Sequence, residues 1–228
     1  MSDFYRFPHT PHLAWLGEGS PRDDKVLVKE EVEKFLSMPI LVEEKLDGAN
    51  LGVSIGPDGG IRFQNRGSYL SSPFTGQFEK LKSWQMLHEN SIFDALDESM
   101  ILFGEWCAAR HSLEYTSLPD YFLGFDVYDK HKKMFLSASR RDALLSEIGL
   151  SAVPRVSQGK FNLEELKKIV SGKSSVYRVG NMEGVILRKE NDDWLVQRAK
   201  LVRPDFTQSI QEHWSKRGIE WNKIYSNY

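Results

Sequence analysis

The residues with the clearest chemical potential are Lys45, Asp47 and Gly48, which form the pattern K-x-D-G. The lysine lies near the end of a hydrophobic stretch, residues 40–46, that is typical of a strand, and the Asp-Gly pair breaks this strand at once. Such a position holds an amine at the mouth of a sheet, partly desolvated and beside other charges, where it can lose its proton and act as a nucleophile. An ordinary lysine in a surface hairpin fits the same four residues, so the pattern alone does not establish catalysis.

The elements that must position this lysine follow from the hydrophobic patterning. Helices are expected at residues 29–37, 74–88, 139–148 and 162–171. Strands are expected at residues 40–46, 50–55, 61–65, 100–106, 121–128, 184–189 and 194–201. Ser139 is expected to cap the third helix and Gly149 to end it, while Pro204 stops the last strand and Asp205 opens a final helix to about residue 216. This order predicts an α+β fold and, without a linker-like gap, a single domain over residues 1–228.

Five further motifs follow K-x-D-G along the chain. They are Asn65-Arg66-Gly67, Phe103-Gly104-Glu105-Trp106, Phe125-Asp126-Val127-Tyr128, Glu183-Gly184-Val185-Ile186 and Arg198-Ala199-Lys200. In this order the six motifs resemble those of the covalent nucleotidyltransferases, the superfamily of DNA ligases, RNA ligases and mRNA capping enzymes. The resemblance covers residues 45–200 and implies a nucleotidyltransferase (ATP-grasp-like) adenylation domain, with antiparallel sheets flanked by helices.

Details within the superfamily resemble an ATP-dependent RNA ligase of the phage double-strand-repair type. Asn50 follows K-x-D-G where those ligases also carry an asparagine, and the Phe125-Asp126 pair resembles theirs. Only 28 residues follow Lys200, whereas the OB domain of DNA ligases and capping enzymes needs roughly 80 or more. No OB domain is therefore expected. The first 44 residues do not resemble the nicotinamide-binding module of NAD-dependent ligases, so ATP is the expected nucleotide.

The resemblance implies a reaction in three steps. Lys45 attacks the α-phosphate of ATP, which releases pyrophosphate and forms lysyl-AMP. The AMP then passes to a 5′-phosphate end, and a 3′-hydroxyl attacks the activated phosphate to seal the strand. Because an amine with an ordinary pKa near 10.4 is protonated at neutral pH, burial and neighbouring cations, including metal, are expected to lower the pKa of Lys45.

The resemblance also implies a role for each remaining residue. Arg198 and Lys200 are expected to assist Lys45, since their spacing on one strand turns both toward the α-phosphate. Glu105 is expected to bind a ribose hydroxyl, and Phe125 to stack on adenine. The other expected nucleotide contacts are Glu44, Asn50 and Arg66, and the expected ligands of Mg²⁺ or Mn²⁺ are Asp126 and Glu183.

The sequence departs from the family pattern at Arg198, where many relatives have a lysine. Arginine keeps the charge and binds phosphate through two hydrogen bonds, but it does not deprotonate. The resemblance therefore supports an electrostatic role at this position and not a proton donor.

Composition limits how the chain meets its partners. With a net charge of −2 and a pI near 6.3, binding to nucleic acid needs a local basic patch, for which Arg140-Arg141 and Arg188-Lys189 are candidates. The single cysteine, Cys107, excludes an internal disulfide and a cysteine-based zinc cluster. Neither a long apolar stretch nor a signal peptide is evident, so a cytoplasmic protein without a membrane partner is expected.

The expected partner is RNA with 5′-phosphate and 3′-hydroxyl ends. A kinase or phosphatase that heals broken ends is compatible with this activity, although no residue indicates one. Two alternatives stay open. One is a DNA ligase or capping-type guanylyltransferase without an OB domain, which nucleotide choice and product would distinguish. The other is a non-catalytic module that binds nucleic-acid ends and forms no lysyl-AMP.

Overall fold

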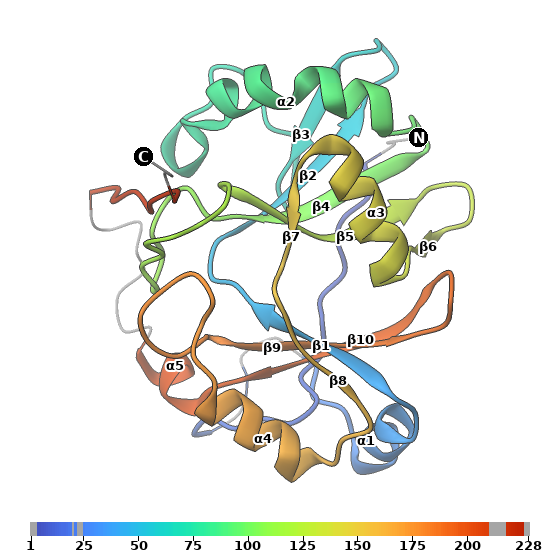
Figure 1. Ribbon diagram of the computed structural model, residues 1–228, viewed down its shortest axis with the longest axis vertical. Helices are drawn as coiled ribbons and strands as arrows, with labels where there is room; N and C mark the ends of the chain where they lie inside the picture. Colours follow the sequence, from blue (N-terminus) through green and yellow to red (C-terminus); the bar gives the residue numbers. More distant parts are fainter. Residues whose placement is uncertain (1–3, 20, 22–24, 210–217, 226–228) are drawn as a thin grey trace.

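The computed structural model describes residues 4–19, 21, 25–209 and 218–225, and its core consists of two sheets (Figure 1). Sheet A has the strand order β10-β9-β1-β8, and sheet B the order β3-β2-β4-β5-β6 with β7 beside β5. The strand pairings are antiparallel apart from β5 with β7. The α+β fold with antiparallel sheets flanked by helices is confirmed.

The strands are β1 (Ile40–Lys45), β2 (Ala49–Ile55), β3 (Ile61–Gln64), β4 (Met100–Trp106), β5 (Phe122–Asp129), β6 (Met134–Phe135), β7 (Ser151–Ala152), β8 (Arg155–Gly159), β9 (Gly184–Glu190) and β10 (Leu195–Val202). The helices are α1 (Lys29–Leu36), α2 (Leu81–Ala95), α3 (Ala138–Ile148), α4 (Leu163–Gly172) and α5 (Pro204–Ser209). None of these helices is long and apolar enough to cross a membrane.

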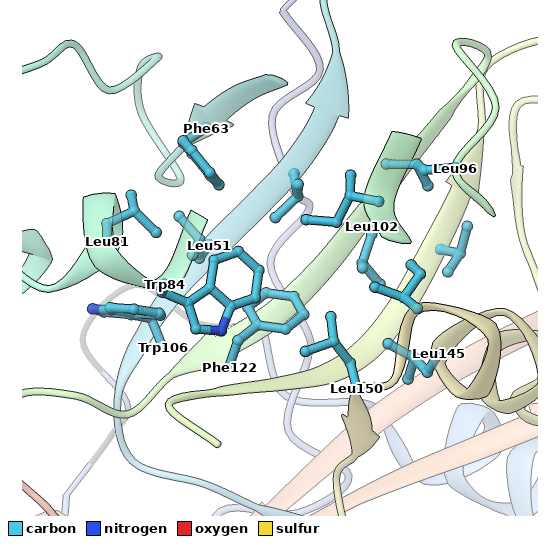
Figure 2. Close-up of a cluster of buried hydrophobic side chains, with 14 of the residues drawn as sticks. Leu51, Phe63, Leu81, Trp84, Leu96, Leu102, Trp106, Phe122, Leu145 and Leu150 are labelled. Atoms are coloured by element: carbon cyan, nitrogen blue, oxygen red, sulfur yellow. The ribbon is translucent and has the colours of Figure 1, made fainter. Parts of the chain in front are cut away.

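Helices cover the outer face of each sheet, which leaves the inner faces to form a cleft. On β1, Ile40 and Val42 point outward and share a buried cluster with Phe35 of α1 and Leu166 of α4. Sheet B is covered by α2 and α3, whose side chains pack with the strand residues of a second cluster (Figure 2). Because side chains alternate along a strand, Glu43 and Lys45 of β1 and Glu105 of β4 point the other way and line the cavity between the sheets.

The N-terminal segment links the two sheets along one side of this space. The ring of Tyr5 stacks on Tyr128 of sheet B, with ring centroids 3.7 Å apart. Further along, His12 forms a parallel bridge with Lys200 of sheet A. Residues 5–12 therefore run from one sheet to the other.

The expected elements are present, with three differences. The second helix, expected at residues 74–88, instead spans Leu81–Ala95. It begins later because Gly76 has a φ of +61° and starts a short 3-10 turn, Gly76–Phe78. The N-cap of α3 is Ser137 rather than Ser139. Here the Glu190 carboxylate accepts hydrogen bonds of 3.1 Å from the amide of Ala138, where negative charge favours a helix start. Gly149 ends α3 in the left-handed conformation, as expected.

The third difference concerns three short strands that patterning did not reveal. Strands β6, β7 and β8 have two, two and five residues, which is too short or too polar for an alternating pattern. The helix expected from Asp205 begins at Pro204 and is described to Ser209. Its expected continuation to residue 216 lies outside the described residues.

A close approach inside sheet B gives a stability prediction. A Cβ atom added to Gly104 would lie 2.3 Å from Cζ of Phe122 and 2.7 Å from the carbonyl oxygen of Leu123. We expect Gly104→Ala to lower the free energy of unfolding by about 2 kcal/mol or more in urea denaturation, because the core cannot take the extra carbon without moving. Gly172→Ala is the control, since a Cβ there meets no atom within 4 Å. Equal stability of the two variants would contradict this packing.

Candidate active site

The K-x-D-G motif lies where the chain crosses from one sheet to the other. Strand β1 ends at Lys45 in sheet A, and β2 begins at Ala49 in sheet B, so residues 46–48 connect the two sheets (Figure 1). The Asp-Gly pair is therefore not a hairpin turn between two paired strands. Leu46 is buried between the sheets in a cluster with Cys107 and Tyr115. This buried leucine anchors the crossing beside the lysine.

Hydrogen bonds fix the two residues that follow Leu46. One oxygen of Asp47, Oδ2, accepts bonds of 2.7 Å from the amides of Ser112 and Leu113, and the Asp47 amide donates to the Tyr115 hydroxyl at 2.8 Å. The Gly48 amide donates to Oε1 of Glu105 at 3.0 Å. A side chain at Gly48 would lie 2.6 Å from the carbonyl oxygen of Trp106, so only glycine fits there.

Lys45 forms an ion pair with Glu183. Its Nζ lies 2.7 Å from Oε1 and 2.8 Å from Oε2 of the carboxylate. Both groups are held by sheet A, because Lys45 on β1 pairs with Gly184 at the start of β9. The side chain of Lys45 is 26% exposed and that of Glu183 only 6%. The Lys45 amine is therefore partly accessible from the cleft, whereas its partner Glu183 is almost wholly buried.

The carboxylates around Lys45 determine the direction in which its pKa shifts. Burial lowers the pKa of Lys45, but the charges of Glu183, Glu105 and Asp47 together raise it above its ordinary value. The expectation of a lowered pKa is wrong for the protein by itself, because its near neighbours are acids and not cations. Burial also raises the pKa of Glu183 to about 8 and that of Glu105 to about 7.

A cavity of about 480 Å³ opens in front of Lys45, a size usual for a small-molecule site. All the residues expected to act on the nucleotide or metal line it, apart from Glu183, which contacts it through Lys45. The lining includes Glu44, Lys45, Asn50, Arg66, Glu105, Phe125, Asp126, Arg198 and Lys200. Residues that lie more than 150 positions apart in the sequence are thus brought to one cavity.

A β-bulge explains how Phe125 and Asp126 both reach this cavity. In the pairing of β4 with β5, Phe103 is opposite Asp126 but Gly104 is opposite Gly124, so Phe125 is an extra residue. A bulge interrupts the alternation of side chains along a strand and re-aims them. Two consecutive residues can therefore line the same cavity.

Asp126 is held by two guanidinium groups. Arg188 Nη1 donates to Oδ1 at 2.6 Å, and Arg198 Nη1 donates to Oδ2. The Arg198 guanidinium also lies over the rings of Phe7 and Phe135, 4.2 and 4.4 Å from their centroids. Burial lowers the pKa of Arg198, although Asp126 opposes this shift. Its side chain is thus fixed in place in the cavity wall.

The expected basic surface patch does not include Arg141 or Arg188, because both are buried. They were expected on a basic patch, but their side chains are 0% and 1% exposed. Arg141 donates to Glu43 Oε1 at 2.7 Å, and both arginines donate to the carbonyl oxygen of Phe125, at 2.8 and 2.9 Å. The network formed by Arg141, Glu43, Arg188, Asp126 and Arg198, here called the buried charge network, joins sheet A to sheet B.

Glu44 and Asn50 each bring to the cavity a buried side-chain oxygen that has no hydrogen-bond partner among the described residues. The Glu44 carboxylate accepts a bond of 3.0 Å from the amide of Val176, and burial raises its pKa. Only 2% of Glu44 is exposed, so it does not face solvent. The side-chain oxygen of Asn50 is also buried but has no hydrogen-bond partner among the described residues. Buried polar atoms are normally paired, so Asn50 has an acceptor to offer a group bound in the cavity.

The oxygen atoms present fit a divalent cation only in part. The described residues contain no group of three or more His, Cys, Asp or Glu side chains that could hold an ion. Mg²⁺ is often bound by one or two protein oxygens together with substrate phosphates and water. Asn50 could supply such an oxygen. Both oxygens of Asp126 are already bound by arginines, and the two oxygens of Glu183 lie 2.7 and 2.8 Å from Lys45 Nζ.

Comparison with known proteins identifies a family and a fold to which this chain is similar. The family model described as RNA ligase matches residues 38–202, while no match was found among curated proteins. An RNA ligase of Naegleria gruberi solved with ATP and Mn is similar over 92% of this chain and 60% of its own, at a TM-score of 0.65 and 16% identity. The same organism's ligase with PPi gives a TM-score of 0.63 and 17% identity over 91% of this chain and 64% of its own.

An archaeal ATP-dependent RNA ligase is similar in the same way. Its TM-score is 0.56 at 17% identity, over 87% of this chain and 48% of its own. The chain thus spans 48% to 64% of the length of these three structures. At these identities the likeness is one of fold.

The raised pKa of Glu105 gives a prediction about pH and stability. Its folded pKa, about 7, lies above the ordinary value of 4.5. The folded state therefore binds this proton more tightly than the unfolded state, and stability falls as pH rises through that window. Glu105→Gln keeps an acceptor for Gly48 and carries no charge. Because the side chain keeps some solvent contact, we expect the variant to gain about 1–2 kcal/mol over the wild type between pH 5 and pH 8.

Denaturant unfolding at the two pH values measures this gain. Glu98→Gln is the control, because Glu98 is exposed. A difference between Glu105→Gln and wild type that stays constant from pH 5 to pH 8 would show that burial does not raise this pKa.

Proposed function

The chain belongs to the RNA ligase family, whose model covers residues 38–202, and we propose that it is an ATP-dependent ligase that joins RNA ends through a lysyl-AMP intermediate. The observation that carries the proposal is the position of the Lys45 amine. It is bonded to a buried carboxylate and faces a cavity lined by the residues expected to bind a nucleotide. A non-catalytic module would not need this amine and its buried partner together.

In the first step, Lys45 Nζ attacks the α-phosphorus of ATP. The N–P bond forms as the bond to the β-phosphate oxygen breaks, and pyrophosphate leaves. The amine must first lose a proton, and the Glu183 carboxylate, in direct contact with Lys45 Nζ, is positioned to accept it. A divalent cation bound with the nucleotide would neutralise charge on the phosphates.

The remaining residues of the cavity have separate roles in binding. Phe125 offers its ring to the adenine and Glu105 a carboxylate to the ribose, while Arg66 and Lys200 offer positive charge to the phosphates. We assign Arg198 and Asp126 to the wall of the cavity, because each already has an ionic partner. In the proposal, Asn50 offers an oxygen to a metal bound with the nucleotide, while Glu183 acts on Lys45.

The later steps concern the RNA. The AMP passes from Lys45 to a 5′-phosphate, and the 3′-hydroxyl of the other end displaces it. The family match favours RNA over the alternatives of a DNA ligase or a capping-type guanylyltransferase. A role in RNA repair and an end-healing kinase or phosphatase as partner follow only from this activity, and stay predictions.

The first test is formation of the covalent intermediate. The protein is mixed with Mg²⁺ or Mn²⁺ and either ATP or GTP labelled at the α-phosphate, and then separated on a denaturing gel. We expect a labelled band from ATP alone, which is absent in Lys45→Ala and present in Lys160→Ala, a change of an exposed lysine. Intact mass detects protein that was adenylated before purification. Neither label nor added mass in the wild type would refute the proposal.

A second test asks whether Glu183 accepts the proton. Glu183→Gln keeps the shape of the side chain but loses the base. It also removes the charge that raises the pKa of Lys45. If Glu183 is the base, single-turnover adenylation near neutral pH should fall by about tenfold or more, equivalent to roughly 1.4 kcal/mol. An increase in rate would instead show that Glu183 only holds Lys45 protonated.

A further inference from the structure

The segment 218–225, here called the C-terminal strap, lies between two stretches of chain that connect β4 to β5. On one side, Trp221 forms an antiparallel bridge with Ala109, and on the other Ile224 forms a parallel bridge with Leu118. The Glu220 carbonyl also accepts a bond of 2.8 Å from the Arg110 amide. The strap therefore takes the place of a central strand between residues 107–110 and 115–118.

Asn222 is the centre of this arrangement. Its side-chain oxygen accepts a bond of 2.8 Å from the amide of Tyr115, and its Nδ2 donates to the carbonyl oxygens of Cys107 and Ala109 at 2.8 and 3.3 Å. Its own amide donates to Ala108 at 2.9 Å. Only 2% of Asn222 is exposed. A primary amide supplies one acceptor and two donors, so this one side chain ties both stretches together.

Residues 112–115, which the strap contacts, also hold Asp47, two residues after Lys45. Asn222 and the Lys223 amide bind both backbone groups of Tyr115, at 2.8 and 3.0 Å. The hydroxyl of this buried tyrosine accepts the bond from the Asp47 amide. Ser112 and Leu113, three and two residues before Tyr115, donate to the Asp47 carboxylate. Every hydrogen bond described for Asp47 is thus formed with residues 112–115.

We propose that the C-terminal strap, acting through Asn222, positions Lys45 for attack. Asn222 is a positioning residue and touches neither the nucleotide nor the reacting atoms. The path runs from Asn222 to Tyr115, from there to Asp47, and over two residues to Lys45. The catalytic part of this inference rests on the proposed adenylation. Displacement of a reacting group by about 1 Å can reduce a rate by about a hundredfold. We therefore expect the anchoring of Asp47, two residues from Lys45, to affect the rate of adenylation.

The path is tested first without reference to activity. Amide hydrogen exchange is compared in wild type, Asn222→Ala and Asn222→Asp, the last of which keeps an acceptor and loses both donors. We expect faster exchange at the amides of Asp47, Ser112 and Leu113 and no change in β3. Two controls are used. Lys223→Ala alters an exposed side chain of the strap, and Val170→Ala weakens the distant cluster beneath sheet A. Exchange at Asp47 that matches the wild type would overturn the proposal.

The effect on catalysis is measured per active molecule. Single-turnover adenylation is followed over a range of ATP concentrations and divided by the final yield of labelled protein, which removes any loss of folded enzyme. Both Asn222 variants should be slower by about tenfold or more, with a half-saturating ATP concentration within about twofold of wild type. Val170→Ala should lose stability without losing this rate.

A purely structural strap would give the opposite pattern. In that case the Asn222 variants would show lower yield but the wild-type rate per active molecule, which would overturn the positioning role. Failure of the wild type to form any lysyl-AMP would refute the proposed function instead, and the exchange measurement would still decide whether the strap controls Asp47.

Discussion

The buried charge network is the interaction on which the two-sheet arrangement depends. Arg188 on sheet A binds Asp126 on sheet B, and Arg141 on α3 binds Glu43 on sheet A. Charged groups in such a place are costly to desolvate, and they are tolerated only when each has partners of good geometry. Loss of one partner would leave an uncompensated buried charge, which costs about 3–5 kcal/mol. The network thus fixes the spacing of the sheets with polar contacts, while the apolar clusters lie mainly on their outer faces.

A polar link between the sheets has a consequence for the cavity. If apolar side chains filled the whole interface, no room would remain for a nucleotide. Here the arginines occupy the interface near Phe125, and the space toward Lys45 stays open. The residues around that space are arranged at a cost to stability, since burial raises the pKa of both Glu105 and Glu183. Perturbed carboxyls of this kind gather at functional sites.

The sequence motifs named many of the residues that line the cavity but not Phe7, Gln77 or Val153. Patterning found the longer strands, because alternation depends on neighbours along the chain. Three features could not be found this way. The bulge at Phe125 depends on the pairing of β4 with β5. The burial of Arg141 and Arg188 depends on acids far away in sequence. Asn222 lies more than 100 residues from the groups it binds. A polar residue in a short segment has no periodicity to reveal it.

Each residue of the short crossing between the sheets is anchored beside the nucleophile. Packed sheets lie about 10 Å apart, and an extended chain advances about 3.3–3.6 Å per residue. The chain leaves sheet A at Lys45 and enters sheet B at Ala49, with three residues between. Four residue steps can reach about 13–14 Å, which exceeds this spacing, so contacts and not the length of the chain hold the crossing. Leu46 is buried, Asp47 is bound by residues 112–115, and Gly48 passes against Trp106. Lys45 therefore precedes a segment in which each residue is held by packing or hydrogen bonds, and this segment supports the backbone from which its amine reaches the cavity.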